Sequence, residues 1–422
     1  MEARLRLTSH CNLNCEYCFA KEFRGRNSGD ISLSDLKMVI NKLKESDITT
    51  LKIQGGEPTC HKGFKEVSQN LRDAGFILHL YTNGIFDNSI TKIICRNYRS
   101  VIINCNQLTG VELETLTKNI DDLLKLGCSV MLGKTISSQT SDVDGFLKFA
   151  KKFKEKIKIR FDASRPHTYR EESFETFKED AHRVIDALLK AKIQGFELEV
   201  DCCYPPCIFS KSEWKLIRKY LRGFWSKCTT IIDISPDLMI TTCFCGAQFT
   251  DLNIDDFISL REASLFAEYI ENKMRFDIPS QSMCITCQKR LSKMCQGGCL
   301  GHKKTALRYS GKKYLEEFRT YFNDLCKSDY KNIISSDFSP MSKCFLLREK
   351  EIGFRDLEQF YEREISQEPD NPFLYAYLAS SVYFTGNYML VNKILQDMPT
   401  TDPEANFIKE KILSKIGENN NE

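Results

Sequence analysis

The sequence contains no apolar run of the roughly 18 residues that a helix needs to cross a bilayer. The opening Met1-Glu2-Ala3-Arg4-Leu5 also lacks the apolar stretch of a secretory signal. Net charge is small, because 60 Lys and Arg oppose 57 Asp and Glu, a formal +3. These absences argue against a membrane protein and give no electrostatic case for nucleic-acid binding. We therefore expect a cytoplasmic protein whose partners include neither a membrane nor a nucleic acid.

Cysteine, in contrast, is abundant, with 19 among 422 residues. A reducing cytosol disfavours disulfides, so clustered thiols in such a chain indicate metal binding. Some cysteines stand apart from the clusters, and we interpret these as small buried apolar side chains. They are Cys60, Cys95, Cys105 and Cys128.

Short β-rich runs alternate with amphipathic segments from Ala3 to about Asp201, which predicts parallel βα units. Parallel strands with crossover helices form either an open doubly wound sheet or a full or partial barrel, and the period alone does not choose between them. The expected strands are Ala3–Thr8, Thr49–Ile53, Ile77–Thr82, Val101–Cys105, Ser129–Leu132, Ile157–Phe161 and Phe196–Val200.

The alternation ends after Asp201, and an irregular cysteine-rich region follows with expected strands at Thr229–Ser235 and Leu238–Thr242. From about Glu351 the pattern is helical and free of cysteine, and the stretch Asn371–Pro399 resembles one tetratricopeptide (TPR) unit. A single such unit stacks too little core to stand alone. We expect three domains, at residues 1–201, 202–345 and 346–422.

Three thiols directly follow the first expected strand, at Cys11, Cys15 and Cys18. The end of a strand is where α/β folds place their chemistry. Three thiolates on one tight loop suit a [4Fe–4S] cluster with one iron left free of protein, because a structural zinc needs a fourth ligand nearby. No further thiol or imidazole follows until Cys60 and His61.

Here the chain resembles the radical S-adenosylmethionine (SAM) superfamily, whose motif CxxxCxxC has an aromatic residue before its last cysteine; Tyr17 fills that place. The resemblance covers about residues 3–201 and implies a partial (β/α)6 barrel. It also implies that Cys11, Cys15 and Cys18 are catalytic, because in this family the free iron binds SAM and one electron cleaves SAM to a 5′-deoxyadenosyl radical.

Two further motifs support the resemblance. Gly55-Gly56-Glu57-Pro58 follows the second strand and matches the family's GGEP motif, which binds the SAM amino group. The two glycines let the backbone come close to a ligand, and the Glu57 carboxylate can pair with the SAM ammonium. Asn83, after the third strand, matches a residue near the nucleoside, and Asn104 ends the fourth strand, where relatives contact SAM. Lys134 and Arg160 could each pair with the SAM carboxylate or serve as a solvated or structural charge.

A second field, Cys284-x2-Cys287-x7-Cys295-x3-Cys299, has enough thiolates for a zinc. Its spacing instead resembles the SPASM and twitch auxiliary-cluster domains that accompany radical SAM enzymes. That resemblance adds Cys228 and Cys243 upstream and Cys326 downstream. The chain departs from the usual SPASM pattern at two places. Seven residues, and not the usual five, precede Cys295, and Leu238 stands where a glycine is common.

By this resemblance the chain holds one or two auxiliary [4Fe–4S] clusters besides the cluster that binds SAM. One auxiliary cluster takes Cys284, Cys287, Cys295 and Cys326. The other takes Cys228, Cys243 and Cys299 with an open fourth place, for which the candidates are Cys202, Cys203, Cys207, Cys245 or a substrate group.

SPASM relatives mostly modify peptides or proteins, so the resemblance implies maturation of a ribosomally made peptide by cross-linking or oxidation, with an electron donor such as flavodoxin or ferredoxin. Because the first strand starts near Met1, leader binding is expected from the C-terminal half or a separate protein. One alternative is a sulfatase-maturing, formylglycine-forming enzyme, although Phe244 stands where that family has an aspartate. The others are a small-molecule SAM-dependent dehydrogenase and a non-catalytic, zinc-stabilised TPR adaptor.

Overall fold

The computed structural model divides the chain into two compact units, which are described separately. The first covers Met1–Ala247 and Asp251–Ala267, and the second covers Gln248–Thr250 and Glu268–Glu422. The residues described are 2–15, 17–18, 20, 29–106, 110–137, 142–165, 174–200, 202–221, 228, 231–241, 243, 252–257, 259–260, 263–264, 282–284, 287–291, 294–302, 362, 365–366, 369–370, 372–383, 387–399, 406, 409–410, 412–413 and 416.

A ten-stranded sheet forms the first unit, in the order β10-β9-β8-β1-β2-β3-β4-β5-β6-β7. From β1 to β7 the neighbours follow the chain and pair in parallel, as in a barrel wall, whereas a doubly wound sheet reverses its order at a switch point. The other edge of β1 pairs with β8 and not with β7, so the barrel is partial. The strands are β1 (Glu2–Arg6), β2 (Thr50–Gln54), β3 (Ile77–Thr82), β4 (Ser100–Asn104), β5 (Ser129–Ile136), β6 (Ile157–Ala163), β7 (Glu197–Val200), β8 (Asp233–Ile234), β9 (Met239–Thr241) and β10 (Leu252–Asn253).

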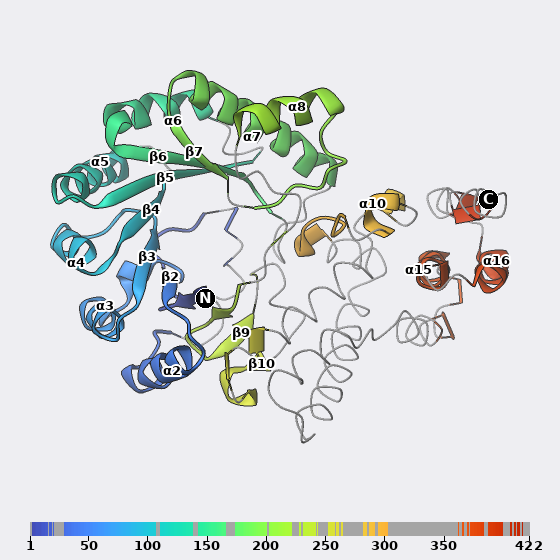
Figure 1. Ribbon diagram of the computed structural model, residues 1–422, viewed down its shortest axis with the longest axis horizontal. Coiled ribbons are helices and arrows are strands. Elements are labelled where there is room, and N and C mark those ends of the chain that lie inside the picture. The colour runs from blue at the N-terminus through green and yellow to red at the C-terminus, as the bar shows by residue number, and fades with distance from the viewer. Residues whose placement is uncertain are drawn as a thin grey trace. The chain divides into compact units, whose positions relative to one another are not determined.

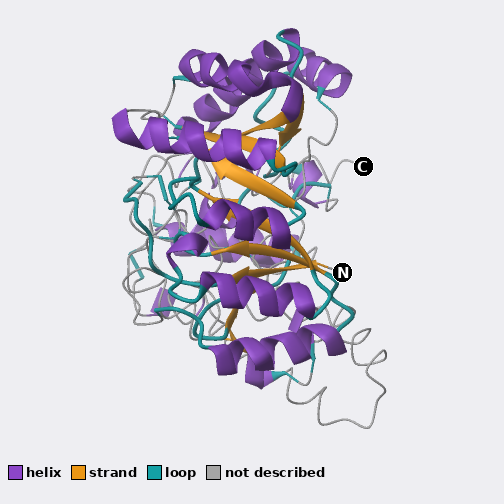
Figure 2. Cartoon of the chain, turned by 90° about the vertical axis from the view of Figure 1, so that its left-hand side faces the viewer, coloured by secondary structure: helices purple, strands orange, loops and turns teal. Residues whose placement is uncertain are grey.

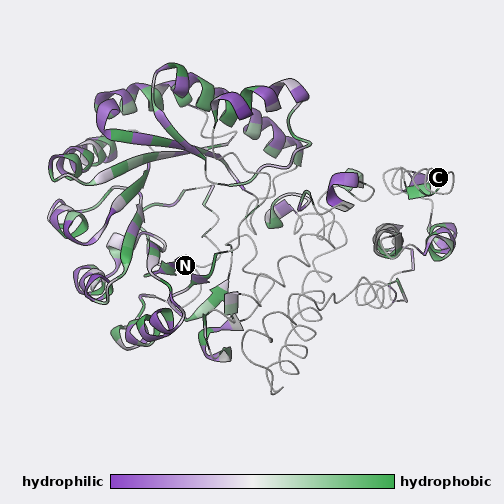
Figure 3. Cartoon of the chain, in the orientation of Figure 1, coloured by the Kyte–Doolittle hydropathy of each residue, from purple (hydrophilic) through white to green (hydrophobic). Residues whose placement is uncertain are grey.

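Helices cover one face of this curved sheet (Figure 1), and the view from that side shows them as a layer in front of the strands (Figure 2). The helices carry both polar and apolar residues (Figure 3), as amphipathic crossovers should, and the strands also contain residues of both kinds. In the first of these helices, Leu36, Val39 and Leu43 are buried. The helices are α2 (Leu33–Glu45), α3 (Phe64–Asp73), α4 (Ile90–Asn97), α5 (Gly110–Lys125), α6 (Val143–Ala150), α7 (Phe174–Ile193) and α8 (Lys211–Tyr220), with short 3-10 turns at Pro58–Cys60, Lys151–Lys156 and Ile254–Asp256.

The hairpin β8–β9 joins the barrel sheet through β1, and a buried ion pair fixes it there. Asp233 Oδ1 accepts a hydrogen bond from Arg6 Nε at 2.6 Å, and its Oδ2 accepts one from Gln54 Nε2 at 2.9 Å. Both charged side chains are almost fully buried. The first part of the cysteine-rich region therefore belongs to the same unit as the barrel.

In the second unit, a helix pair confirms the helices expected near the C-terminus. α15 (Pro372–Tyr383) begins with its proline and contacts α16 (Tyr388–Asp397), whose N-cap Asn387 accepts a hydrogen bond from Leu390 N at 3.2 Å. The assignment of this pair to the TPR family and the three domain limits stay predictions. Within the described residues, no helix is both long and apolar enough to span a membrane.

Candidate active site

The cysteine loop, residues 9–29, leaves the end of β1 and returns to it through a narrow neck. Ser9 N donates to Gly29 O at 2.9 Å, and Ile31 N donates to Leu7 O at 2.8 Å. Thr8 and Asp30 form an isolated antiparallel bridge between the two sides. The loop is thus closed at its base by backbone hydrogen bonds to the sheet.

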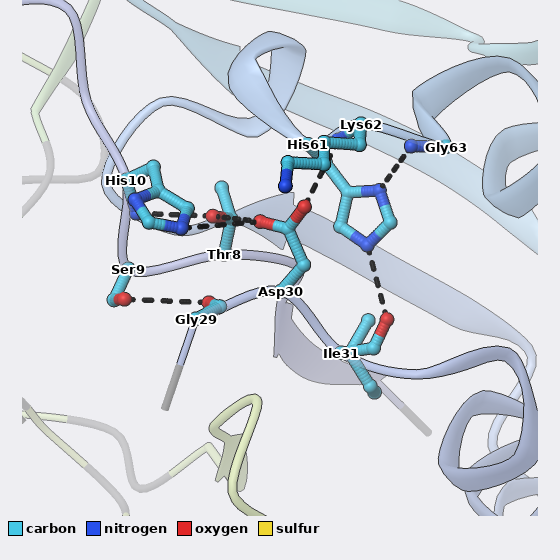
Figure 4. Close-up of polar contacts among 9 residues, drawn as sticks. All are labelled: Thr8, Ser9, His10, Gly29, Asp30, Ile31, His61, Lys62 and Gly63. Atoms are coloured by element: carbon cyan, nitrogen blue, oxygen red, sulfur yellow. Dashed lines mark hydrogen bonds and ion pairs between the residues drawn. The ribbon is translucent and has the colours of Figure 1, made fainter. Parts of the chain in front are cut away.

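Asp30 reinforces this neck with its side chain (Figure 4). Its Oδ1 accepts from Thr8 Oγ1 at 2.6 Å, its Oδ2 accepts from Lys62 N at 3.0 Å, and His10 Nε2 lies 3.9 Å from Oδ1. Burial acts to raise the pKa of Asp30, but the hydrogen bonds from Thr8 and Lys62 outweigh it and lower that pKa. The ionised carboxylate therefore joins the start of the cysteine loop to the segment after η1 (Pro58–Cys60).

His61 completes the group in Figure 4 from the other side of the neck. Gly63 N donates to its Nδ1 at 2.9 Å, and its Nε2 lies 3.1 Å from the carbonyl oxygen of Ile31. Both ring nitrogens of this buried side chain thus have backbone partners, which indicates a structural role. His61 is not a fourth ligand for the trio in this arrangement.

Within the loop, Cys11, Cys15 and Cys18 are all half-buried. Cys18 N donates to Cys15 O at 3.2 Å, and Leu13 N donates to Cys11 Sγ at 3.4 Å. No three His, Cys, Asp or Glu side chains among the described residues gather closely enough to hold a single metal ion. Three half-buried thiols on one loop are nevertheless the ligand set of a [4Fe–4S] cubane that keeps one iron free of protein.

Tyr17, the predicted aromatic residue of the motif, connects the loop to another strand end. Its hydroxyl hydrogen-bonds with Cys15 and with the side chain of Asn106, which follows β4. Burial, and then the neighbouring Cys15 thiol, raise the pKa of Tyr17, so its hydroxyl stays neutral.

The paired glycines of the GGEP segment lie directly beneath the start of the loop. Gly56 N donates to Thr8 O and Glu57 N donates to His10 O, both at 2.7 Å. A Cβ on Gly56 would stand 2.2 Å from His10 O, and one on Gly55 would stand 2.6 Å from Thr8 O. These positions therefore require glycine because the loop backbone occupies the space of a side chain.

Glu57 is buried and acts as a cross-link between strand ends. Its Oε1 accepts from Thr82 Oγ1 at 2.8 Å and from Thr59, while its Oε2 accepts from Asn83 N at 2.7 Å. Burial raises the pKa of this carboxyl, and the hydrogen bonds from Asn83, Thr59 and Thr82 oppose that rise. The predicted contact with the SAM amino group stays a prediction, and Oε2 is the oxygen with fewer hydrogen bonds. Pro58 begins the short η1 turn that follows.

Asn83 lies beside the cysteine loop, because its Nδ2 donates to Asn12 Oδ1 at 2.7 Å, and its place near the SAM nucleoside stays a prediction. Asn12 in turn donates to Ile85 O at 2.7 Å. Nothing in the spacing of the sequence marks Asn12 or Asp30 as part of the site. Their partners lie more than 20 positions away along the chain.

Lys134 and Arg160, the two candidate partners of the SAM carboxylate, lie on opposite faces of the sheet. Lys134 is buried on the helix-covered face, with its Nζ 5.9 Å from the centre of the Phe146 ring on α6, and burial lowers its pKa. Arg160 shares its register row with Asn104 and Gly133, and its guanidinium lies 5.4 Å from the Tyr81 ring centre. Lys134 therefore has the structural role, and Arg160 lies on the uncovered face with Asn104.

The cysteines that stand apart behave differently from one another. Cys105 is buried, as expected, and Cys60 is only half-buried. Cys95 and Cys128 were expected to be separate apolar side chains, and this was wrong, because they form a disulfide with a Cα–Cα distance of 5.5 Å. Cys128 precedes β5, so the bond lies at the opposite end of the strands from the cysteine loop.

Four of the second-field cysteines are described, and they belong to the second unit. Cys284 and Cys295 are buried, and Cys287 and Cys299 are half-buried. Short local hydrogen bonds hold them, from Cys295 N to Lys289 O at 2.8 Å and from Gly297 N to Cys295 Sγ at 3.3 Å. Cys326 lies outside the described residues.

The upstream pair flanks the hairpin of the first unit, with Cys228 before β8 and Cys243 after β9. Leu238, which replaces a common glycine, has a positive φ of 63°. That is the left-handed conformation glycine normally supplies, so the backbone keeps the shape although the residue differs. Both cysteines are half-buried.

Comparison with known proteins agrees with this geometry. Residues 5–184 match the model of the radical SAM superfamily, so this part of the chain is a radical SAM domain. Proteins of this superfamily use a [4Fe–4S] cluster with SAM, and the cysteine loop with its glycine floor fits that pair.

Among individual proteins, the S-adenosylmethionine-dependent nucleotide dehydratase of Selenomonas ruminantium is 37% identical over 84 residues, 20% of this chain and 30% of the relative. The 7,8-dihydro-6-hydroxymethylpterin dimethyltransferase of Methanocaldococcus jannaschii is 37% identical over 86 residues, 20% of this chain and 17% of the relative. The chain thus matches under a third of either length. The structure of Streptococcus suis SuiB bound to S-adenosylmethionine has a TM-score of 0.53 at 18% identity, covering 74% of each chain, which shows a shared fold.

Proposed function

We propose that the chain is a radical SAM enzyme that cleaves SAM reductively and uses the product to abstract hydrogen from a peptide or protein, leading to a cross-link or an oxidation. The observation that carries the proposal is the cysteine loop, which is fixed on the Gly55-Gly56 floor by backbone hydrogen bonds at 2.7 Å. The bound cluster supplies the electron that breaks a carbon–sulfur bond of SAM.

The residues of this chain bind, orient and shield. Cys11, Cys15 and Cys18 hold the cluster, and the two glycines let the backbone of the cysteine loop pack directly against them. Glu57, held by Thr82 and Asn83, presents a fixed carboxylate oxygen to the SAM ammonium.

On the uncovered face, Arg160 is the candidate partner for the SAM carboxylate, and Asn104 for its ribose. Arg160 lies over the Tyr81 ring, so its guanidinium is already oriented before the ligand binds.

The peptide substrate is proposed from the cysteine pattern, since Cys228, Cys243, Cys284, Cys287, Cys295, Cys299 and Cys326 match the auxiliary-cluster arrangement of peptide-modifying relatives. The positive φ of Leu238 supports it, because the hairpin keeps the shape that the pattern's glycine usually gives. The dehydratase and the pterin methyltransferase each match only 20% of this chain and under a third of their own length, so their names carry no information on this chain's substrate. A flavodoxin or ferredoxin is the proposed electron donor.

Product analysis tests the proposal. The protein is reconstituted anaerobically with iron and sulfide, reduced with dithionite and incubated with SAM, and 5′-deoxyadenosine is measured by liquid chromatography and mass spectrometry. We expect turnover in the wild type and its loss in the Cys11→Ala/Cys15→Ala/Cys18→Ala variant.

The matched control is the Cys95→Ser/Cys128→Ser variant, which also removes thiols but at the far end of the strands. It should retain turnover. Stoichiometric zinc without SAM cleavage would instead support a zinc-stabilised adaptor. The peptide part of the proposal fails if no peptide stimulates 5′-deoxyadenosine formation while a small molecule does.

A further inference from the structure

We propose that Cys203 is a ligand of the auxiliary iron–sulfur cluster that Cys228 binds, with Arg165 as the buried cation beside it. This inference rests on the proposed function, because it takes an auxiliary cluster in the cysteine-rich region as given. The spacing of the sequence leaves the fourth place of that cluster open among several thiols. The structure distinguishes them by contact and burial.

The first observation that points to Cys203 is a contact. Its thiol hydrogen-bonds with the thiol of Cys228, although the two lie on separate segments, one after β7 and one before β8. Cys203 is 8% exposed, whereas Cys207 is exposed. Two thiols brought together from distant segments are what a shared metal centre requires of its ligands.

The segment that carries Cys203 is held rigidly through its neighbour Tyr204. The Tyr204 hydroxyl donates to Asp162 Oδ1 at 2.8 Å and accepts from Ala163 N at 3.0 Å, at the end of β6. Tyr204 is completely buried, and its ring stacks on Phe177 with centres 5.8 Å apart. A cluster ligand needs such support, because small shifts of its thiolate change the coordination.

Arg165 gives the site a positive charge. Its guanidinium is 4% exposed, donates to Asp162 Oδ1 at 2.9 Å, and lies 4.5 Å and 4.8 Å from the ring centres of Phe177 and Tyr204. Arg165 also lies close enough to the Cys203 thiol to act on it electrostatically. A cluster with thiolate ligands is an anion, so a fixed buried cation favours its binding over that of neutral thiols.

The test begins from the Cys11→Ala/Cys15→Ala/Cys18→Ala variant, in which the remaining iron reports on auxiliary sites alone. After anaerobic reconstitution, iron and sulfide per chain are measured, and Mössbauer and electron paramagnetic resonance spectra are recorded. Adding Cys203→Ala should remove up to about four irons per chain and change the spectra. Adding Cys207→Ala, the matched exposed thiol, should change neither.

Other outcomes separate the ideas. Unchanged iron and superimposable spectra in Cys203→Ala overturn the inference, and so does a loss produced by Cys202→Ala instead. If the parent variant holds no auxiliary iron, the proposed cluster itself fails. Cys203→Ser, which keeps the side-chain volume, and circular dichroism exclude misfolding as the cause. If iron is unchanged and reduction of the denatured apoprotein releases two more thiols than the Cys95–Cys128 disulfide accounts for, the Cys203–Cys228 pair is a disulfide, and the inference is wrong.

Discussion

The two cysteine-rich regions are held in different ways. The cysteine loop is closed by hydrogen bonds to residues of the sheet, such as Gly56 N to Thr8 O and Ile31 N to Leu7 O. Among residues 282–302, the described backbone hydrogen bonds are short-range, such as Cys287 N to Cys284 O at 3.4 Å. The first region takes its shape from the barrel, and the second depends on local turns and on any metal it binds.

The comparison suggests a division of labour. A loop fixed before the cluster arrives can present one iron to SAM in a defined place. Where metal binding completes the fold of a region, the segments between its ligands can vary in length. The gap of seven residues before Cys295, usually five, is an example. The predictions below test each side of this comparison.

The largest effect is expected at the junction of the hairpin and the barrel. Asp233→Ala removes the buried carboxylate that pairs with Arg6 Nε, so it should lower the free energy of unfolding by about 3–5 kcal/mol. Urea denaturation of the apoprotein followed by circular dichroism measures this. Glu2→Gln, which breaks an exposed pair with Lys52, should cost under about 1 kcal/mol. Equal losses would mean that the buried pair does not anchor the hairpin.

Metal removal should separate the two regions. Chelation of the holoprotein is expected to speed amide hydrogen exchange about a hundredfold in residues 282–302, roughly 2.7 kcal/mol of lost protection. Strands β1 to β3 should change only a few-fold, because their hydrogen bonds do not involve the cluster. Exchange that rises equally in both regions would contradict the distinction.

A smaller effect is expected beneath the cysteine loop. Gly56→Ala places a methyl group on His10 O, so the loop must shift, at a cost of about 1–3 kcal/mol. Iron at the first site and SAM turnover should fall at least about tenfold. Gly63→Ala, whose Cβ would lie 3.5 Å from the His61 ring, should be nearly neutral. Full activity in Gly56→Ala would show that the floor is not needed.

The smallest effect concerns the hairpin turn. Leu238→Gly should raise the free energy of unfolding by about 1 kcal/mol, because a left-handed conformation is costly for leucine and free for glycine. Thermal denaturation of the apoprotein detects such a gain. Leu238→Ala, which keeps a Cβ, should show no gain. A destabilised glycine variant would mean that the leucine side chain contributes more than the strain costs.

The sequence predicts the barrel well because strand signals are local. The strand Ile77–Thr82 has the predicted limits, while β5 and β6 extend further, to Ile136 and Ala163. The extensions were missed because Gly133, Lys134 and Asp162 interrupt the apolar pattern. Periodicity reports which face is buried but not how far a parallel pairing continues.

Local sequence patterns could not predict contacts between residues that lie far apart in the chain. Asp233 meets Arg6 across 227 positions and Cys128 meets Cys95 across 33, and no motif marks either pair. An argument from cellular compartment also misled at the disulfide, since composition cannot show which thiols are neighbours. At the cysteine loop, motif spacing identified the trio but not Asp30, which closes its neck.

The most direct test of the account is electron paramagnetic resonance of the reduced protein with and without SAM. The difference spectrum between the wild type and the Cys11→Ala/Cys15→Ala/Cys18→Ala variant isolates the signal of the first cluster. We predict that SAM shifts the g-values of this signal, because SAM binds the iron that has no protein ligand. A signal that SAM leaves unchanged, or no iron at the trio, would contradict the account.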